Sequence, residues 1–374
     1  MHPAVLLLET LRLRGGPEPA WLRATWTTAK TRGLVRLVAF EECALWLHRR
    51  LKQGGLAGAQ TPAFARWLER SAREAAARNL RIDAQTEAIL RLLDSEGIPH
   101  VLLKGAARRA AARLFPLPYA NARGTQDVDV LVPAAQARYA WQQLRARGYD
   151  YSTRAEFTPA GHYHLPPVCN RARVAVELHT STSSAVPADE AWRRANAGAA
   201  EFRHNGLTLR VPAPTELLWH GVTHAVEQGA FGFRLRHFQD AAVILASGAA
   251  LDWQGIRARL DSAEIADRRA TAAWLGAAGS LAGTMLPEEI VGRVPPFDLS
   301  RALRWRLAVL GRLSLTARLG EKFLEEGTRA ELGWGLTPAI AGTSVVLRGR
   351  RRAAAAIARG TYRLWCAAAD PRAR

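Results

Sequence analysis

The sequence has few cysteines, and they follow no recognisable pattern. Its 374 residues include only three, Cys43, Cys169 and Cys366, which are far apart in the chain. This spacing matches neither a set of metal ligands nor a disulfide framework. The scarcity of cysteine favours a reducing compartment, and we expect a cytoplasmic protein.

The sequence also lacks a long apolar run and a leader pattern. No stretch reaches the ~18 consecutive apolar residues that a membrane-spanning helix requires. The apolar run near the N-terminus is interrupted at Glu9. It is not followed by the small residues of a cleavage site, so it does not resemble a signal peptide. We therefore expect no membrane span.

Lysine is scarce, although the chain is strongly basic. The formal net charge is +19, and the 52 basic residues are arginines except for Lys30, Lys52, Lys104 and Lys322. The arginines are dispersed along the chain, and no RNA-binding signature accompanies them. Nucleic acid is therefore a partner that the charge permits but the pattern does not favour, and affinity for polyphosphates is a milder interpretation.

Hydrophobic periodicity divides the chain into three regions. Apolar residues recur at helical spacing before and after a central part that contains short apolar strands. We therefore predict a mostly helical α+β protein with a small mixed sheet. The predicted regions are an N-terminal helical region over 1–95, an α/β core over 96–212 and a C-terminal helical domain over 213–374. Helices are expected at 3–13, 18–31, 34–53 and 61–95, and again at intervals from Thr215 onward.

The central region alternates strand and helix patterns. Strands are predicted at 101–104, 127–132, 149–154, 160–169 and 173–180, with helices between them at about 105–114, 133–148 and 187–198. The dipeptide Asn205-Gly206 is typical of a tight β-hairpin turn. The tail 349–369 has the pattern of a solvated basic helix packed on the body, with a membrane-surface helix as the alternative.

Three acidic residues stand out within the predicted strands. Asp127 and Asp129 are two apart, so in a strand they point to the same face, while Val128 and Val130 point to the other. Glu177 has a similar place in VAVELH. If the two strands are neighbours, three carboxylates converge. Such a cluster is unstable without a cation, and hard divalent ions such as Mg²⁺ prefer oxygen ligands.

Other polar patterns leave alternatives open. The pair His162 and His164 fits a metal or substrate site, but a polar strand face is the simpler interpretation. His220 and His224 are four apart without the glutamate of a zinc-protease motif, and we predict no zinc there. Two larger groups have structural interpretations. An interhelical ion-pair network is expected from Arg234, Arg236 and Asp240, and core packing from Trp21, Trp26, Trp46 and Trp274.

The order of these motifs resembles the uncharacterised nucleotidyltransferase family of the polymerase-β-like superfamily. Relatives tend to show an LKG, an Arg four residues before D-x-D-x-L-V, a later Gly-Tyr, and an acid followed by Leu-His. The matching residues are Lys104-Gly105, Arg123, Asp127 and Asp129, Gly148-Tyr149, and Glu177-Leu178-His179, with Arg236 and Asp240 in the following helices. The resemblance extends over about residues 80–290.

The resemblance implies transfer of a nucleoside monophosphate from an NTP, such as ATP, with Mg²⁺ or Mn²⁺. Asp127, Asp129 and Glu177 would bind the metal and be catalytic. Lys104, backbone N–H groups at Gly105, and Arg123 would contact the triphosphate. His179 would hydrogen-bond a metal-binding carboxylate. The Ser that often follows the glycine in this superfamily is absent, since Ala106 follows Gly105.

The acceptor is not evident from the sequence, and a biosynthetic peptide, a small molecule and a protein all fit the resemblance. Two alternative functions are retained. The D-x-D also resembles the metal-binding motif of glycosyltransferases, although Glu177 and the early LLKG favour nucleotidyl transfer. A non-catalytic scaffold that binds nucleic acid or protein would agree with the positive charge, although the intact carboxylates oppose it.

Overall fold

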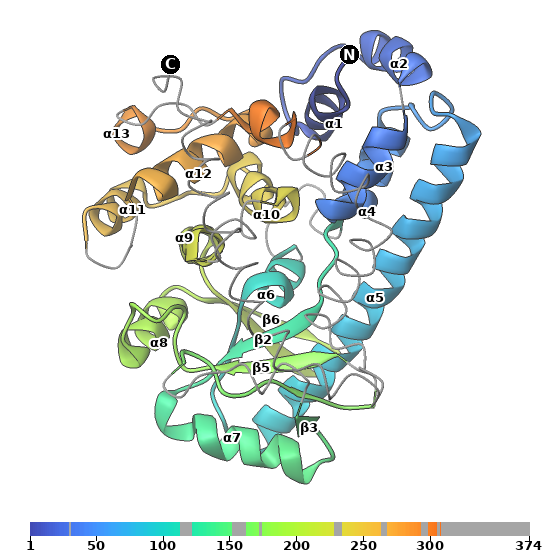
Figure 1. Ribbon diagram of the computed structural model, residues 1–374. Helices are drawn as coiled ribbons and strands as arrows, with labels where there is room; N and C mark the ends of the chain where they lie inside the picture. Colours follow the sequence, from blue (N-terminus) through green and yellow to red (C-terminus); the bar gives the residue numbers. More distant parts are fainter. Residues whose placement is uncertain are drawn as a thin grey trace, which may run out of the picture.

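The computed structural model describes residues 1–29, 31–112, 122–151, 162–171, 174–227, 234–262, 268–292, 298–304 and 307. Helices surround a small sheet (Figure 1). This confirms the predicted mostly helical α+β class with a small mixed sheet. The expected basic helix at 349–369 lies outside the described residues.

The N-terminal part of the chain consists of helices. They are α1 (Pro3–Leu11), α2 (Pro19–Thr28), α3 (Thr31–Phe40), α4 (Ala44–Gln53) and the long α5 (Pro62–Ser95). The single helix predicted over 34–53 is wrong, because the chain turns between α3 and α4 at Glu42, whose φ is +53°. This turn directs Glu41 and Glu42 toward the C-terminal helices, as described below.

The sheet combines parallel and antiparallel pairs. Its strands are β1 (Val101–Leu102), β2 (Asp127–Leu131), β3 (Asp150–Tyr151), β4 (Val168–Cys169) and β5 (Ala175–His179), in the order β1-β2-β5-β4-β3. Among the described strands of this sheet, only β2 and β5 pair in parallel. Along the chain, α6 (Lys104–Ala111) lies between β1 and β2, and α7 (Ala134–Ala146) lies between β2 and β3. The two strands that carry the acidic residues are therefore neighbours.

A separate hairpin follows α8 (Ala188–Asn196). Strands β6 (Ala200–His204) and β7 (Leu207–Val211) pair with His204 opposite Leu207. The two residues between them, Asn205 and Gly206, have φ values of +51° and +77°. Asparagine and glycine tolerate this left-handed conformation best, which confirms the hairpin predicted at this dipeptide.

The C-terminal helices are α9 (Pro214–Glu227), α10 (Leu235–Ala246), α11 (Trp253–Leu260), α12 (Arg268–Ala282) and α13 (Glu288–Val291). Asp252 caps α11, because its carboxylate accepts a hydrogen bond from the N–H of Gly255 at 2.8 Å. Within the described ranges, no helix has both the length and the apolar character needed to cross a bilayer.

Among the described residues, two large hydrophobic cores and one small cluster around Val101 and Leu131 are buried, and α5 contributes to both large cores. The first core joins the N-terminal and C-terminal helices, with Trp26, Trp46 and Trp274 fully buried. The second lies under the sheet and includes the far end of α5 (Figure 1). Core packing was predicted for Trp21 as well, but its 44% exposure shows that it faces solvent. The three-region division stays a prediction, although helices from both ends of the chain share one core.

Candidate functional site

The acidic residues meet on the two central strands. In the parallel register Asp129 lies opposite Glu177 and Asp127 lies opposite Ala175. Asp129 and Glu177 therefore share one face, and both are buried, while Val128 and Val130 are buried on the other face. Asp127, two residues earlier on the same strand, is only half-buried. The predicted convergence of the two strands is thus present, with Asp129 and Glu177 at its centre.

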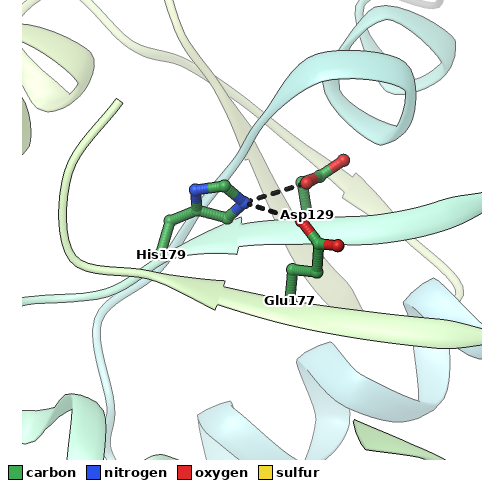
Figure 2. A group of neighbouring side chains, drawn as sticks. All are labelled: Asp129, Glu177 and His179. Carbon is green, nitrogen blue, oxygen red and sulfur yellow. Dashed lines mark hydrogen bonds and ion pairs between the residues drawn. The ribbon is translucent and has the colours of Figure 1, made fainter. Parts of the chain in front are cut away.

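Lys104 and His179 hold these two carboxylates. The Nζ of Lys104 is 2.7 Å from Oδ1 of Asp129 and 3.6 Å from Oε2 of Glu177. Figure 2 shows the imidazole of His179 turned toward both acids, with its Nε2 at 2.9 Å from Asp129 Oδ1 and 3.5 Å from Glu177 Oε2. Because carboxylates only accept, Nε2 carries the proton. His179 therefore orients the carboxylates from the side.

These contacts keep the two buried carboxylates, Asp129 and Glu177, ionised. Burial opposes ionisation of Glu177, but Lys104 and then His179 outweigh it, so the pKa of Glu177 is well below its ordinary value. The pKa of Asp129 is lowered by the same balance. Burial and Lys104 oppose protonation of His179, yet its hydrogen bonds to the two acids raise its pKa. At neutral pH the site therefore has two carboxylates and a fixed ammonium.

One carboxylate atom has no partner within the described structure. Oδ2 of Asp129 is buried without a hydrogen bond. Asp129, Glu177 and His179 each carry a possible ligand atom, and these atoms lie within 4.8 Å of one another. Nε2 of His179 cannot bind a cation while it carries the proton that it donates to the acids, so the two carboxylates are the ligands at hand. A buried carboxylate oxygen with nothing to bond is costly unless a donor or cation reaches it. The donor set therefore fits a hard divalent cation, and Asp127 lines the same cavity nearby.

The start of α6 places Lys104 beside the acids. The N–H of Leu103 donates to the carbonyl of Asp129 at 3.0 Å, which fixes this turn against β2. Lys104 itself has a φ of +46°, a left-handed conformation that is unusual for a non-glycine residue. Such strain persists where the surrounding structure determines it, and it is common at functional sites.

Gly105 is required by close packing. A Cβ added there would lie 2.7 Å from Cγ2 of Thr125 and 2.8 Å from Nη1 of Arg123. The segment before β2 therefore lies directly on the start of α6. This contact brings Arg123 to the cavity that contains the acids.

Asn79 fixes the same segment from α5 and was missed in the sequence. Its Nδ2 donates to the carbonyl of Arg123 at 2.8 Å, and its Oδ1 accepts from the N–H of Thr125 at 3.0 Å. It is buried. A polar residue on the buried stripe of an amphipathic helix was the only available signal, because its partners are 44 and 46 residues away.

The acids open into a cavity of about 440 Å³ whose wall also carries four arginines, Arg108, Arg123, Arg234 and Arg236. Asp240 pairs with Arg108 at 2.6 Å and with Arg123 at 2.8 Å. The ion pairs expected of Arg234, Arg236 and Asp240 are therefore present, but with other partners.

Those other partners come partly from the turn between α3 and α4. Glu42 pairs with Arg234 at 2.7 Å and also with Arg236. Its Oε2 accepts from Gln126 at 3.0 Å, next to Asp127. The adjacent Glu41 accepts from the N–H of Leu235 at 2.7 Å and so caps α10. Nothing in the sequence pointed to Glu42, because the pairing joins positions nearly two hundred residues apart.

Arg108 was also missed, although it had a recognisable signal. It lies four residues after Lys104, which places both side chains on one face of α6. Its side chain is only 2% exposed. Burial lowers the pKa of Arg108 to about 10 despite the opposing charge of Asp240, so it remains a cation at neutral pH.

Histidines surround the acids in an uncharged form. Nε2 of His164 is 3.9 Å from Oε2 of Glu177, and burial lowers the pKa of His164 to about 4. The ring of His162 meets that of His164 edge to face, with ring centroids 4.2 Å apart. Burial also lowers the pKa of His220 to about 3 and that of His224 well below its usual range. These rings add polar surface without charge.

The mostly helical α+β fold thus places two carboxylates opposite each other on neighbouring strands, in a cavity lined by both basic and acidic side chains. Comparison with known proteins assigns the family. The model of a family described as uncharacterised nucleotidyltransferase matches residues 27–278, well over half of the chain. The protein belongs to this family. The match begins further upstream than the resemblance near residue 80 and includes Glu42.

Other comparisons add little. The chain shows a distant similarity to the crystal structure of an antigenic nucleotidyltransferase-like protein from Paracoccidioides brasiliensis. The sequence identity is 16% and the TM-score 0.32, over 44% of this chain and 75% of that chain. No curated protein matches the chain. The assignment therefore depends on the family match.

Proposed function

We propose that this protein is a divalent-metal-dependent nucleotidyltransferase that moves a nucleoside monophosphate from an NTP, such as ATP, to an acceptor hydroxyl. The observation that carries the proposal is the pair of buried carboxylates, Asp129 opposite Glu177, with an unpartnered Oδ2 on Asp129. Together with the family, it favours Mg²⁺ or Mn²⁺ as the cofactor. The acceptor is a small molecule, peptide or protein.

The metal ligands in this proposal are Asp127, Asp129 and Glu177. A bound divalent cation would offset charge on the phosphate oxygens and lower the pKa of the acceptor hydroxyl. Lys104 and Arg123 would contact the triphosphate, with backbone N–H groups at Gly105. His179 keeps the carboxylate of Asp129 oriented through the 2.9 Å hydrogen bond.

The proposed transfer is a single displacement at phosphorus. The acceptor oxygen bonds to the α-phosphorus, and the bond from that phosphorus to the bridging oxygen of the β-phosphate breaks. Pyrophosphate leaves with the electron pair. The acceptor proton passes to a carboxylate, either Glu177 or Asp129. Either acid can accept it only when Lys104 no longer neutralises that acid, so Lys104 is expected to turn toward the phosphates.

The test measures label transfer from each NTP, with Mg²⁺ or Mn²⁺ and host extract as the source of acceptor. Asp129→Asn and Glu177→Gln keep the shape of each side chain but remove its charge. Each should lower transfer by roughly a hundredfold or more, since metal-assisted charge stabilisation contributes several kcal/mol. Asp83→Asn is the control, because Asp83 pairs with Arg109 outside the cavity.

Two outcomes would contradict the proposal. One is that no NTP is bound or consumed, even with manganese and extract, which would favour a non-catalytic scaffold. The other is transfer that survives both amide variants. Transfer of a labelled sugar, when a sugar nucleotide replaces the NTP in this assay, would instead support the glycosyltransferase alternative.

A further inference from the structure

Four arginines line the cavity, and the function proposed above gives a role to only one of them, Arg123. We call Arg108, Arg123, Arg234 and Arg236 the arginine cluster. They come from α6, from the segment before β2, and from the start of α10, and all four line the same cavity as the acids. Two adjoining segments of the chain and the distant α10 therefore bring cations to one wall.

Arg108 provides the strongest sign that a ligand belongs there. Its side chain is 2% exposed, and its Nε lies 2.6 Å from Oδ1 of Asp240. Its Nη1 and Nη2 are buried and have no hydrogen-bond partner in the described residues. Buried N–H donors that lack acceptors destabilise a protein. An anion in the cavity would supply those acceptors.

The carboxylates that accompany the cluster do not neutralise it. Asp240 is shared between Arg108 and Arg123, and Glu42 is shared between Arg234 and Arg236. Among the ion pairs of the described residues, two acids therefore face four arginines, an excess of two positive charges. The shared carboxylates hold the guanidinium groups in place, and the excess charge is available to an anion.

The charges of the whole cavity suggest which anion. The lining contains five basic and five acidic residues: Lys104, Arg108, Arg123, Arg234, Arg236, Glu42, Asp127, Asp129, Glu177 and Asp240. The cavity is therefore neutral as a whole but polarised, with the acids of β2 and β5 on one part and the arginine cluster on another. A phosphate chain with divalent cations at one end complements this pattern.

We propose that the arginine cluster is a metal-independent binding site for a phosphate chain. This proposal rests on the function proposed above. In that reaction, the phosphate chain consists of the β- and γ-phosphates of the NTP, which leave as pyrophosphate. Arg108 is about 6 Å along α6 from Lys104, at 1.5 Å per residue. The two side chains therefore contact successive parts of one chain. Arg108, Arg234 and Arg236 are binding residues, and Asp240 and Glu42 are positioning residues.

The first experiment is calorimetric titration of the full chain with pyrophosphate in EDTA. The wild type should bind. Arg108→Gln should bind about tenfold or more weakly, because a charge-assisted contact is lost. Arg109→Gln is the matched control. Arg109 is the next residue of α6, is 9% exposed and pairs with Asp83, yet it does not line this cavity. Its affinity for pyrophosphate should equal that of the wild type.

A second pair of variants keeps the test decisive if Arg108→Gln does not fold. Arg236→Gln should also weaken pyrophosphate binding, while Arg259→Gln should not. The two arginines are equally exposed, 18% and 19%, and each pairs with one glutamate, but Arg259 is outside the cavity. Absence of pyrophosphate binding in EDTA, or equal loss in the controls, would overturn the proposal.

Competition identifies the source of the phosphate chain. Displacement of pyrophosphate by an NTP supports the β- and γ-phosphates as the natural ligand. Simultaneous binding of both would overturn that assignment and would indicate a phosphate group on the acceptor instead. These titrations require neither a metal ion nor catalytic transfer. A negative result in them is therefore distinguishable from a negative result in the transfer assay.

Discussion

Replacing Lys104 by Met tests the electrostatics of the site directly. Lys104 is 15% exposed and lies 2.7 Å from Asp129, which is 1% exposed, and 3.6 Å from Glu177, which is 10% exposed. Methionine has a similar length but no charge. The change leaves two buried carboxylates facing each other, and within the described structure His179 is then the one side chain paired with both. Breaking a buried pair by removing one partner costs about 3–5 kcal/mol.

The expected cost in EDTA at pH 7 is near the lower limit of that range, about 3 kcal/mol, because the cavity admits some water. A divalent cation should restore much of it. A ligand at one hundred times its dissociation constant stabilises the native state by about 2.7 kcal/mol. The Met variant should gain more than the wild type, since Lys104 no longer competes for the same oxygens.

The assay is urea unfolding of wild type and variant, in EDTA and with saturating Mg²⁺ or Mn²⁺. Lys52→Met is the control, because Lys52 is exposed on α4. The difference in unfolding free energy should also shrink in acid. The pKa of Glu177 is lowered in the native state, so the stability from its pairing is present above the unfolded pKa and is lost as pH falls. Two results would refute the reasoning. One is a difference in unfolding free energy between wild type and the Met variant below about 1 kcal/mol in EDTA, and the other is a difference that added metal does not reduce.

Three further predictions concern the surroundings of the site. Gly105→Ala places a Cβ 2.7 Å from Thr125 and should destabilise the fold by about 1–3 kcal/mol in urea unfolding, whereas Gly124→Ala, with its nearest neighbour at 4.0 Å, should not; equal effects would contradict this. Asn79→Ala removes two buried hydrogen bonds, of 2.8 and 3.0 Å, and should cost about 1–3 kcal/mol per group left unpaired. It should also weaken NTP binding in calorimetry, and unchanged affinity would exclude a positioning role. Burial and then Lys104 lower the pKa of His220 from 6.5 to about 3, so its neutral form stabilises the native state fully above pH 6.5 and progressively less below it. His220→Asn should therefore lose less stability between pH 6.5 and 4 in urea unfolding, and identical pH profiles would contradict the burial.

Local pattern was sufficient for much of the fold. The alternation in DVDVL fixed which residues of β2 face the core, because the side-chain period of a strand does not depend on its neighbours. The Asn205-Gly206 turn and the long helix α5 were also predictable, because a turn dipeptide and helical apolar spacing are likewise local features of the sequence. The turn at Glu42 was not, since the apolar spacing of α3 continues into α4 and only the positive φ of one residue breaks it.

Pairings across the chain were beyond reach of local pattern. Trp21 and Trp26 are both tryptophans of α2 for which core packing was predicted. Trp21 faces solvent and Trp26 is buried, because exposure depends on which elements pack against α2. The partners of Asn79 and Glu42 are far away in sequence. Arg108 shares a helix face with Lys104, but it is recognised as a candidate binding residue only from the burial of its guanidinium and the position of Asp240.

The sequence by itself determined the candidate chemistry: two acids on one strand face, a third on a later strand, and a lysine and a glycine at the start of a helix. Tertiary structure decided how these groups meet. It placed β2 beside β5, brought Lys104 into contact with both Asp129 and Glu177, and assembled the arginine cluster from α6, the segment before β2 and the distant α10. Periodicity is a property of neighbours along the chain, whereas a charged cavity depends on which faces pack together, and that is set by the burial of apolar surface over the whole molecule.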